Sequence, residues 1–456
     1  MKVYHESFVT VPLDVPSRYR AWLMAAVFTA AAAYSVVHVL VSGVVQPLRA
    51  DNVGQVVEEL QPLYRLFTTG AATVDHPRQY GPIFLLLFHP VYRFTLSRPD
   101  ILAWYAYGLD LLAIAVAFFA TRRGIHVWAA ARGITLSKWT TPALLFLWAN
   151  FSPLYGVLAI KNVELWELAL MAVAGTALLE QRRWLAGWSI GAAALVKMLP
   201  LALLPYLLLR DRRAFAYALV AIATTLTVSQ LLYGDQMGFG YLPMILQAAS
   251  GGEGFGNVHG MIRHENVSIR GLAFKAFGYL ETPDPTAAHP YQLGYYVVVS
   301  DRLRPYAVAV SGVVFAAALA WLVARLFRNR SMRRADLLYW EWALMAIMML
   351  VLAPQISQDY MVLTLGAFSY VMAGCLLRRD VSLWMQFTIA VLLVGNVLPR
   401  TIFGRLLLVD YGMSAAGHEH LQLAEAYQYF GFPLLGLLVL LRVWSRVADT
   451  DAPGRT

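Results

Sequence analysis

The chain has 456 residues, of which 59% are hydrophobic and only 14% are charged. Soluble domains carry roughly a quarter charged residues, so this composition excludes a soluble globular protein. The formal charge of +9 lies mostly in short Lys/Arg clusters between apolar runs, which is typical of membrane orientation signals and not of a nucleic-acid-binding surface. The composition therefore predicts an all-α polytopic membrane protein with membrane lipids, and no nucleic acid, as partners.

Apolar runs long enough to cross a bilayer follow one another along the chain, and each crossing needs about 20 residues. The candidate runs are 21–45, 101–120, 140–158, 163–180, 184–209, 214–233, 305–326, 339–356, 360–377, 382–399 and 427–442, with a shorter one at 81–95. The run 184–209 contains Lys197 and Pro200 in its middle, which predicts one kinked helix or two short helices meeting near Lys197. The predicted total is about 11 to 13 transmembrane helices.

Basic clusters predict which loops share a side of the membrane. We place in the cytoplasm the clusters near residues 18–20, 122–123, 182–183, 210–213, 325–334, 378–379 and 442–446. The periplasmic face then carries the loop 46–80, the turn at 161–162, the long loop 234–303, the turn 354–359 and the loop 400–425. Before Arg122 the number of predicted crossings differs by one from the number that this assignment requires. Either 81–98 is re-entrant or the cluster at Arg122 is on the other side. The whole chain, 1–456, is treated as one membrane domain.

The first periplasmic loop, 46–80, contains the strongest candidate for a catalytic residue. Asp51 follows the first apolar run by only a few residues, whereas Glu58 and Glu59 fall in an amphipathic segment that is expected to lie along the membrane interface. Tyr64 and Tyr80, with a Gly-Pro pair after Tyr80, indicate a shaped loop. We predict that Asp51 is functional; the alternative is a solvated loop carboxylate.

Basic residues on the same predicted face are candidates for binding an anion. A lysine inside an apolar run is costly in hydrocarbon, so Lys197 is expected to face a cavity or a partner, or else to extend to the interface. The long loop adds a dense polar set that is either functional or simply solvated: Arg263, His264, Asn266, Ser268 and Arg270.

Several segments, taken together and in order, resemble the GT-C membrane glycosyltransferases, and specifically glycosyltransferase family 87. That family includes actinobacterial mannosyltransferases of phosphatidylinositol mannoside and lipoarabinomannan synthesis, and some arabinofuranosyltransferases. The resembling segments are Asp51, Gln79–Phe84, Asn150–Leu154, Lys161–Val163, Gly187–Gly191, Lys197–Pro200, Asn266–Gly271 and Pro354–Tyr360. The resemblance implies a GT-C-like helical bundle with periplasmic loops and interfacial helices.

The sequence also departs from the family pattern at three places. Gly81-Pro82 stands where a double proline is usual, the turn at 161–164 reads Lys-Asn-Val-Glu, and the segment ending at Tyr360 reads Gln-Asp-Tyr. These departures fall near the expected substrate site, so they leave the sugar and the acceptor open.

The resemblance implies an inverting transfer of a sugar from a polyprenyl-phosphate donor to a hydroxyl of a lipid-linked or glycan acceptor. Mannose is the first expectation and arabinofuranose the alternative, in a bacterial plasma membrane with the active site on the periplasmic face. Asp51 is the expected general base, since an attacking hydroxyl needs a base within hydrogen-bond reach. Expected phosphate ligands are Lys197, Arg263, His264 and Arg270; expected substrate-binding residues are Tyr64, Tyr80, Asn162, Asn266, Ser268, Asp359 and Tyr360.

A lipid flippase or transporter is the rival class for such a chain. It predicts polar residues along a path through both leaflets, whereas the polar residues here gather on one face. For a transferase we expect no cofactor and no metal, because the acidic residues of that face lie in different segments and hard divalent ions prefer several oxygen ligands.

Overall fold

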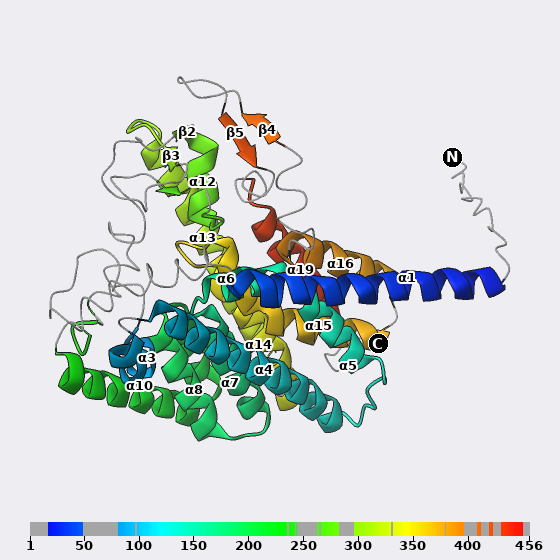
Figure 1. The fold of residues 1–456 in the computed structure, drawn as a ribbon, viewed down its shortest axis with the longest axis horizontal. Coiled ribbons are helices and arrows are strands. Elements are labelled where there is room, and N and C mark those ends of the chain that lie inside the picture. Colours follow the sequence, from blue (N-terminus) through cyan, green and yellow to red (C-terminus); the bar gives the residue numbers. More distant parts are fainter. Residues whose placement is uncertain are drawn as a thin grey trace.

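The computed structural model describes residues 17–48, 81–95, 98–234, 237–241, 243, 262–263, 266–281, 296–329, 332–378, 380–395, 408–411, 419–422 and 430–449. Helices make up most of this part of the chain, and they pack into one bundle with a long helix, α1, extending from it (Figure 1). The prediction of a helical membrane protein is confirmed.

Every apolar run predicted in the first half of the chain is a helix or a broken pair of helices. The elements are α1 (Ser17–His38), η1 (Val39–Val45), η2 (Gln46–Leu48), α3 (Pro82–Thr95), α4 (Pro99–Ala131), α5 (Thr140–Ala149), α6 (Ser152–Ile160), α7 (Glu164–Leu179), α8 (Arg183–Val196), η4 (Leu199–Leu203), α9 (Leu204–Arg210) and α10 (Arg212–Tyr233). The run 184–209 is thus two short helices that part at Lys197, one of the two outcomes predicted.

The second half continues in the same way, with α12 (Ile269–Phe277), α13 (Arg304–Arg328), α14 (Arg334–Val351), η7 (Gln358–Thr364), α15 (Leu365–Arg378), α16 (Val381–Gly395) and α19 (Phe432–Asp449). The predicted loops 234–303 and 400–425 also contain short antiparallel strands, which the sequence did not predict. β1 (Ile262–Arg263), β3 (Tyr296–Val298) and β2 (Tyr279–Glu281) pair in that order, and β4 (Leu408–Tyr411) pairs with β5 (Glu419–Gln422).

The sequence predicts about 11 to 13 membrane-spanning helices, and the described residues can be compared with this number. In the described residues five helices are long and apolar enough, or six if α5 and α6, bent by 51°, count as one broken span. Three of the predicted runs form helices shorter than a span, because α7, α8 and α16 have 16, 14 and 15 residues. α3 has 14 residues, about 21 Å of helix, which favours the re-entrant alternative for 81–98.

Close helix packing explains two glycines of the family-like pattern. A Cβ on Gly187 would lie 2.3 Å from the carbonyl oxygen of Ala214, and one on Gly191 would lie 2.6 Å from that of Ala218. α8 and α10 therefore approach each other through small residues, as membrane helices commonly do.

Ion pairs bring three of the predicted cytoplasmic clusters, 182–183, 210–213 and 325–334, to one end of the bundle, hereafter the basic end. Arg183 and Arg334 both contact Asp211, at 3.0 and 3.3 Å, and the buried Arg210 lies 2.6 Å from Glu341. These pairs join the ends of α8, α9, α10 and α14, so clusters far apart in the sequence share one end, as predicted.

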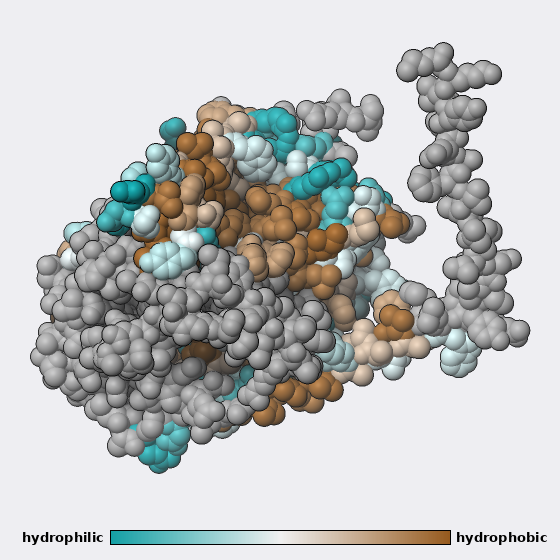
Figure 2. Space-filling view, turned by 90° about the horizontal axis from the view of Figure 1, so that it is seen from above, coloured by the Kyte–Doolittle hydropathy of each residue, from teal (hydrophilic) through white to brown (hydrophobic). Residues whose placement is uncertain are grey.

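Apolar side chains cover much of the outer surface. In the most apolar stretch of residues 25–48 only 17% of the residues are buried inside the bundle, and in that of α13 only 11%. Figure 2 shows broad hydrophobic areas, bordered by hydrophilic patches, on the part of one face that is not drawn in grey. Such a surface suits contact with lipid.

Candidate active site

The break between α8 and η4 creates a polar centre at the end of the bundle opposite the basic end. In a continuous helix the N–H of residue 200 would donate to the carbonyl of Val196, but Pro200 has no N–H. The Val196 carbonyl instead accepts from the N–H of Gly81 at 2.8 Å. The N–H of Gly81, just before α3, thus satisfies the carbonyl that the break leaves without a helical partner.

Position 81 has room only for glycine. A Cβ at this position would lie 1.9 Å from the carbonyl oxygen of Leu195. A proline here would also lack the N–H that reaches Val196. Glycine fits this close approach, and a proline at position 81 would not.

Lys197 lies at the break, in extended conformation (φ −151°, ψ 155°). Its Nζ donates to Glu164 Oε1 at 2.6 Å, and the two side chains are 8% and 1% exposed. The same Nζ lies 4.5 Å from the ring centroid of Tyr360 in η7. The lysine is therefore held inside the bundle and does not extend to the interface.

Glu167 lies one helical turn beyond Glu164 on α7 and is completely buried. Neither of its carboxylate oxygens has a hydrogen-bond partner among the described residues, and the same holds for Glu164 Oε2. Tyr241 and Tyr360 interact electrostatically with Glu167 and with Lys197. We call Glu164, Glu167, Lys197 and Tyr360 the buried centre.

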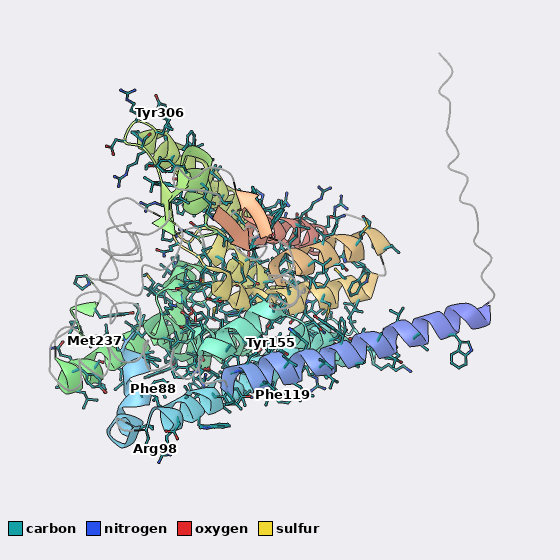
Figure 3. The ribbon with its side chains drawn as sticks, turned by 45° about the horizontal axis from the view of Figure 1, so that its top comes forward. Phe88, Arg98, Phe119, Tyr155, Met237 and Tyr306 are labelled. Atoms are coloured by element: carbon teal, nitrogen blue, oxygen red, sulfur yellow. The ribbon has the colours of Figure 1, made fainter. Side chains whose placement is uncertain are left out.

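The turn between α6 and α7 contacts η2 at this end of the bundle. Lys161 adopts a left-handed conformation (φ 54°), and its Nζ donates to the carbonyl of Pro47 at 2.7 Å. Burial lowers the pKa of Lys161 to about 8, and the nearby Asp110 opposes this shift. Asp110 accepts from the indole of Trp166 at 2.9 Å. Figure 3 shows Phe88, whose ring stacks on Trp166 at 5.7 Å, at this end with Met237.

Two other family-like segments meet beside the buried centre. Asn266 Oδ1 accepts from the N–H of Ser268 at 3.0 Å and from that of Ile356 at 3.2 Å. Ser268 Oγ donates to the carbonyl of Pro354 at 3.0 Å and accepts from the N–H of Gly271, so it caps α12. Both side chains are buried and hold 266–271 against 354–356, directly before η7.

Some of the remaining predicted site residues lie outside the part of the chain that the structure describes, and others lie within it. Asp51, Tyr64, Tyr80 and His264 lie outside the described residues, and Arg263 is described only through its backbone in β1. Asn162 accepts from the N–H of Val163 at 2.9 Å, and Asp359 lies against Gly156, 3.4 Å from a Cβ placed there.

Arg270 has its guanidinium 5.5 Å from the ring centroid of Phe274 on α12. Burial, together with the nearby Arg304, lowers the pKa of Arg270. Two guanidinium groups thus lie near each other at this end of the molecule.

Glu164 and Glu167 were not among the residues predicted from the sequence. Their spacing of three residues at the start of an apolar helix was the available signal, because carboxylates within a membrane helix are costly and face a partner or a cavity.

The polar centre can be compared with known proteins. No curated protein matches the chain. A solved structure that it resembles is that of ArnT from Cupriavidus metallidurans bound to undecaprenyl phosphate, with 16% identity and a TM-score of 0.37 over 93% of this chain and 74% of that one. A sequence model, glycosyltransferase family 87, matches residues 79–354 and so includes the break at Lys197, both glutamates and the 266–271 segment. The chain belongs to glycosyltransferase family 87.

Proposed function

We propose that this membrane glycosyltransferase moves a sugar from a polyprenyl-phosphate donor to a hydroxyl of a lipid-linked or glycan acceptor, with inversion at the anomeric carbon. Mannose is the expected sugar and arabinofuranose the alternative. The site would lie at the end of the bundle opposite the basic end, on the periplasmic face of a bacterial plasma membrane. The proposal rests above all on the buried Lys197, which lies at a helix break beside two carboxylates.

Asp51 is the proposed general base. It follows Leu48 by three residues, which span at most about 11 Å of extended chain, and Leu48 itself follows the Pro47 carbonyl that Lys161 contacts. As the acceptor oxygen attacks the anomeric carbon, its proton passes to Asp51. The bond between the anomeric carbon and the phosphate oxygen breaks, and polyprenyl phosphate leaves with the electron pair.

The proposed ligands of the donor phosphate are Lys197, Arg263, His264 and Arg270. Lys197 is a buried cation beside Glu164, and we propose that its ammonium also contacts the donor phosphate. Arg270 and Arg304 repel each other, and an anion bound between them would relieve that repulsion. Fixed cations of this kind stabilise charge that develops on a leaving phosphate.

We further propose that Glu167 binds hydroxyl groups of the transferred sugar. A buried carboxylate is costly unless its oxygens accept hydrogen bonds. Both oxygens of Glu167 lack such partners among the described residues, and sugar hydroxyls would supply them. Tyr64, Tyr80, Asn162, Asp359 and Tyr360 remain proposed substrate-binding residues, whereas Asn266 and Ser268 would act by positioning the segment before η7.

The test is a transfer assay with the protein in nanodiscs and a panel of polyprenyl-phosphate sugars, read out as labelled product. Asp51→Asn should retain donor binding and lose turnover by about two to four powers of ten. Glu58→Gln, in the same loop, serves as the matched control and should remain active. Near-normal transfer by Asp51→Asn would reject the assignment of the base.

The same assay separates the role of Glu167 from that of the base. Glu167→Gln should raise KM for the donor, with a smaller change in kcat, because it removes contacts made in the bound ground state. Glu180→Gln, at the other end of α7, is the control. An unchanged KM would show that Glu167 does not contact the sugar.

A further inference from the structure

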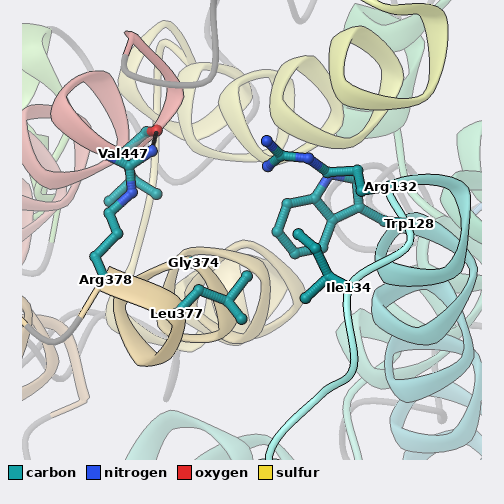
Figure 4. A pocket seen from close by; sticks show the side chains of 7 residues that line it. All are labelled: Trp128, Arg132, Ile134, Gly374, Leu377, Arg378 and Val447. Atoms are coloured by element: carbon teal, nitrogen blue, oxygen red, sulfur yellow. Dashed lines mark hydrogen bonds between the residues drawn. The ribbon is translucent and has the colours of Figure 1, made fainter. Parts of the chain in front are cut away.

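A pocket of about 220 Å³ opens at the basic end, far from the buried centre. It lies between the last turns of α4, α15 and α19, with one wall from the segment that follows α4 (Figure 4). Its lining residues are Trp128, Arg132, Ile134, Gly374, Leu377, Arg378 and Val447. Two of these are arginines and none is acidic, so the lining favours an anion.

The two arginines are held in place by different kinds of contact. Arg132 lies 3.5 Å from Asp336 through its Nε, and its guanidinium is 5.5 Å from the ring centroid of Trp128. Arg378 donates to the backbone carbonyls of Arg446 and Val447 at the end of α19. These contacts orient the guanidinium of Arg378 at the pocket.

The rest of the lining is apolar and lies at the level expected for lipid headgroups. Trp139 and Trp184, which are 64% and 57% exposed, lie near the same end of the bundle, and tryptophans are enriched at membrane interfaces. Leu377 is 37% exposed at the pocket edge, where it can contact an acyl chain. The pocket therefore combines a cationic rim with an apolar wall at the membrane surface.

We propose that this pocket binds an anionic phospholipid of the bilayer, with the headgroup phosphate between Arg132 and Arg378 and an acyl chain against Ile134 and Leu377. The planar guanidinium presents paired N–H donors that match phosphate oxygens. Basic pockets between membrane helices are a recognised place for anionic lipid headgroups. The lipid would join the ends of α4, α15 and α19, and it would be separate from the donor at the opposite end.

The test uses the full-length protein in detergent, with lipid retention measured by native mass spectrometry. Phosphatidylglycerol, phosphatidylethanolamine and inorganic phosphate are titrated separately. The wild type should prefer phosphatidylglycerol over phosphatidylethanolamine, and Arg132→Gln combined with Arg378→Gln should lower this preference by at least about fivefold. Arg212→Gln combined with Arg213→Gln removes the same charge from exposed residues of the same end and should leave the preference unchanged.

A second variant tests the cavity without changing charge or any arginine. Ile134→Trp should fill the pocket and lower the retention of phosphatidylglycerol, and it decides the question if the arginine variant does not fold. The proposal is overturned if Ile134→Trp keeps wild-type retention, or if the Arg212 and Arg213 control loses the preference equally. Competition by inorganic phosphate at the same concentration as the lipid would also overturn it, because the pocket would then bind a soluble anion.

Discussion

Replacing Lys197 by methionine tests whether this lysine is structural, functional or both. The methionine keeps most of the volume but leaves Glu164, whose side chain is 1% exposed, without its cation. Breaking a buried ion pair costs about 3–5 kcal/mol, which is roughly two to four powers of ten in the folding equilibrium.

The double variant Lys197→Met with Glu164→Gln separates stability from catalysis. Removing both charges should restore most of the lost stability, because no unpaired ion remains in the pair. If Lys197 binds the donor phosphate, the double variant should still fail to use polyprenyl-phosphate sugars at donor concentrations that the wild type uses. Stability is measured by thermal unfolding in nanodiscs, and donor use by the transfer assay.

Two results would refute this reasoning. If Lys197→Met alone is as stable as the wild type, the ion pair of Lys197 with Glu164 contributes nothing to folding, in conflict with its burial. A stable double variant with wild-type donor kinetics would show that Lys197 has only a structural role.

Three further predictions concern the surroundings of the buried centre. Gly81→Ala should destabilise the protein by about 1–3 kcal/mol in thermal unfolding, because its Cβ would meet a backbone carbonyl; Gly108→Ala, with open space around it, should not. The lowered pKa of Lys161 means that the unfolded chain binds more protons between pH 8 and 10.5, so stability should rise with pH across this window by up to about 3 kcal/mol, and Lys161→Met should remove the rise. Transfer activity should survive EDTA without added magnesium or manganese; a loss that either ion restores would instead indicate a carboxylate metal site that includes Asp51.

The sequence by itself determined the class of protein and several local features. Membrane localisation follows from composition, because a chain with 14% charged residues cannot cover a water-facing surface. The break at Lys197 follows from Pro200, because its missing N–H leaves the carbonyl four residues earlier without a helical hydrogen bond. Loop charges also predicted that the basic clusters 182–183, 210–213 and 325–334 share one end, because the orientation rule depends on sequence alone.

Only the tertiary structure decided which residues meet. Lys197 pairs with Glu164, 33 positions away, and Asn266 bonds Ile356, 90 positions away, because helix packing brings these segments together. Hydropathy reports that a position is buried but not which neighbour it has, so the meeting of Glu164 with Lys197 was not predicted. Among the described residues only five or six helices are long and apolar enough to span a bilayer, and an apolar run buried among other helices need not itself be that long.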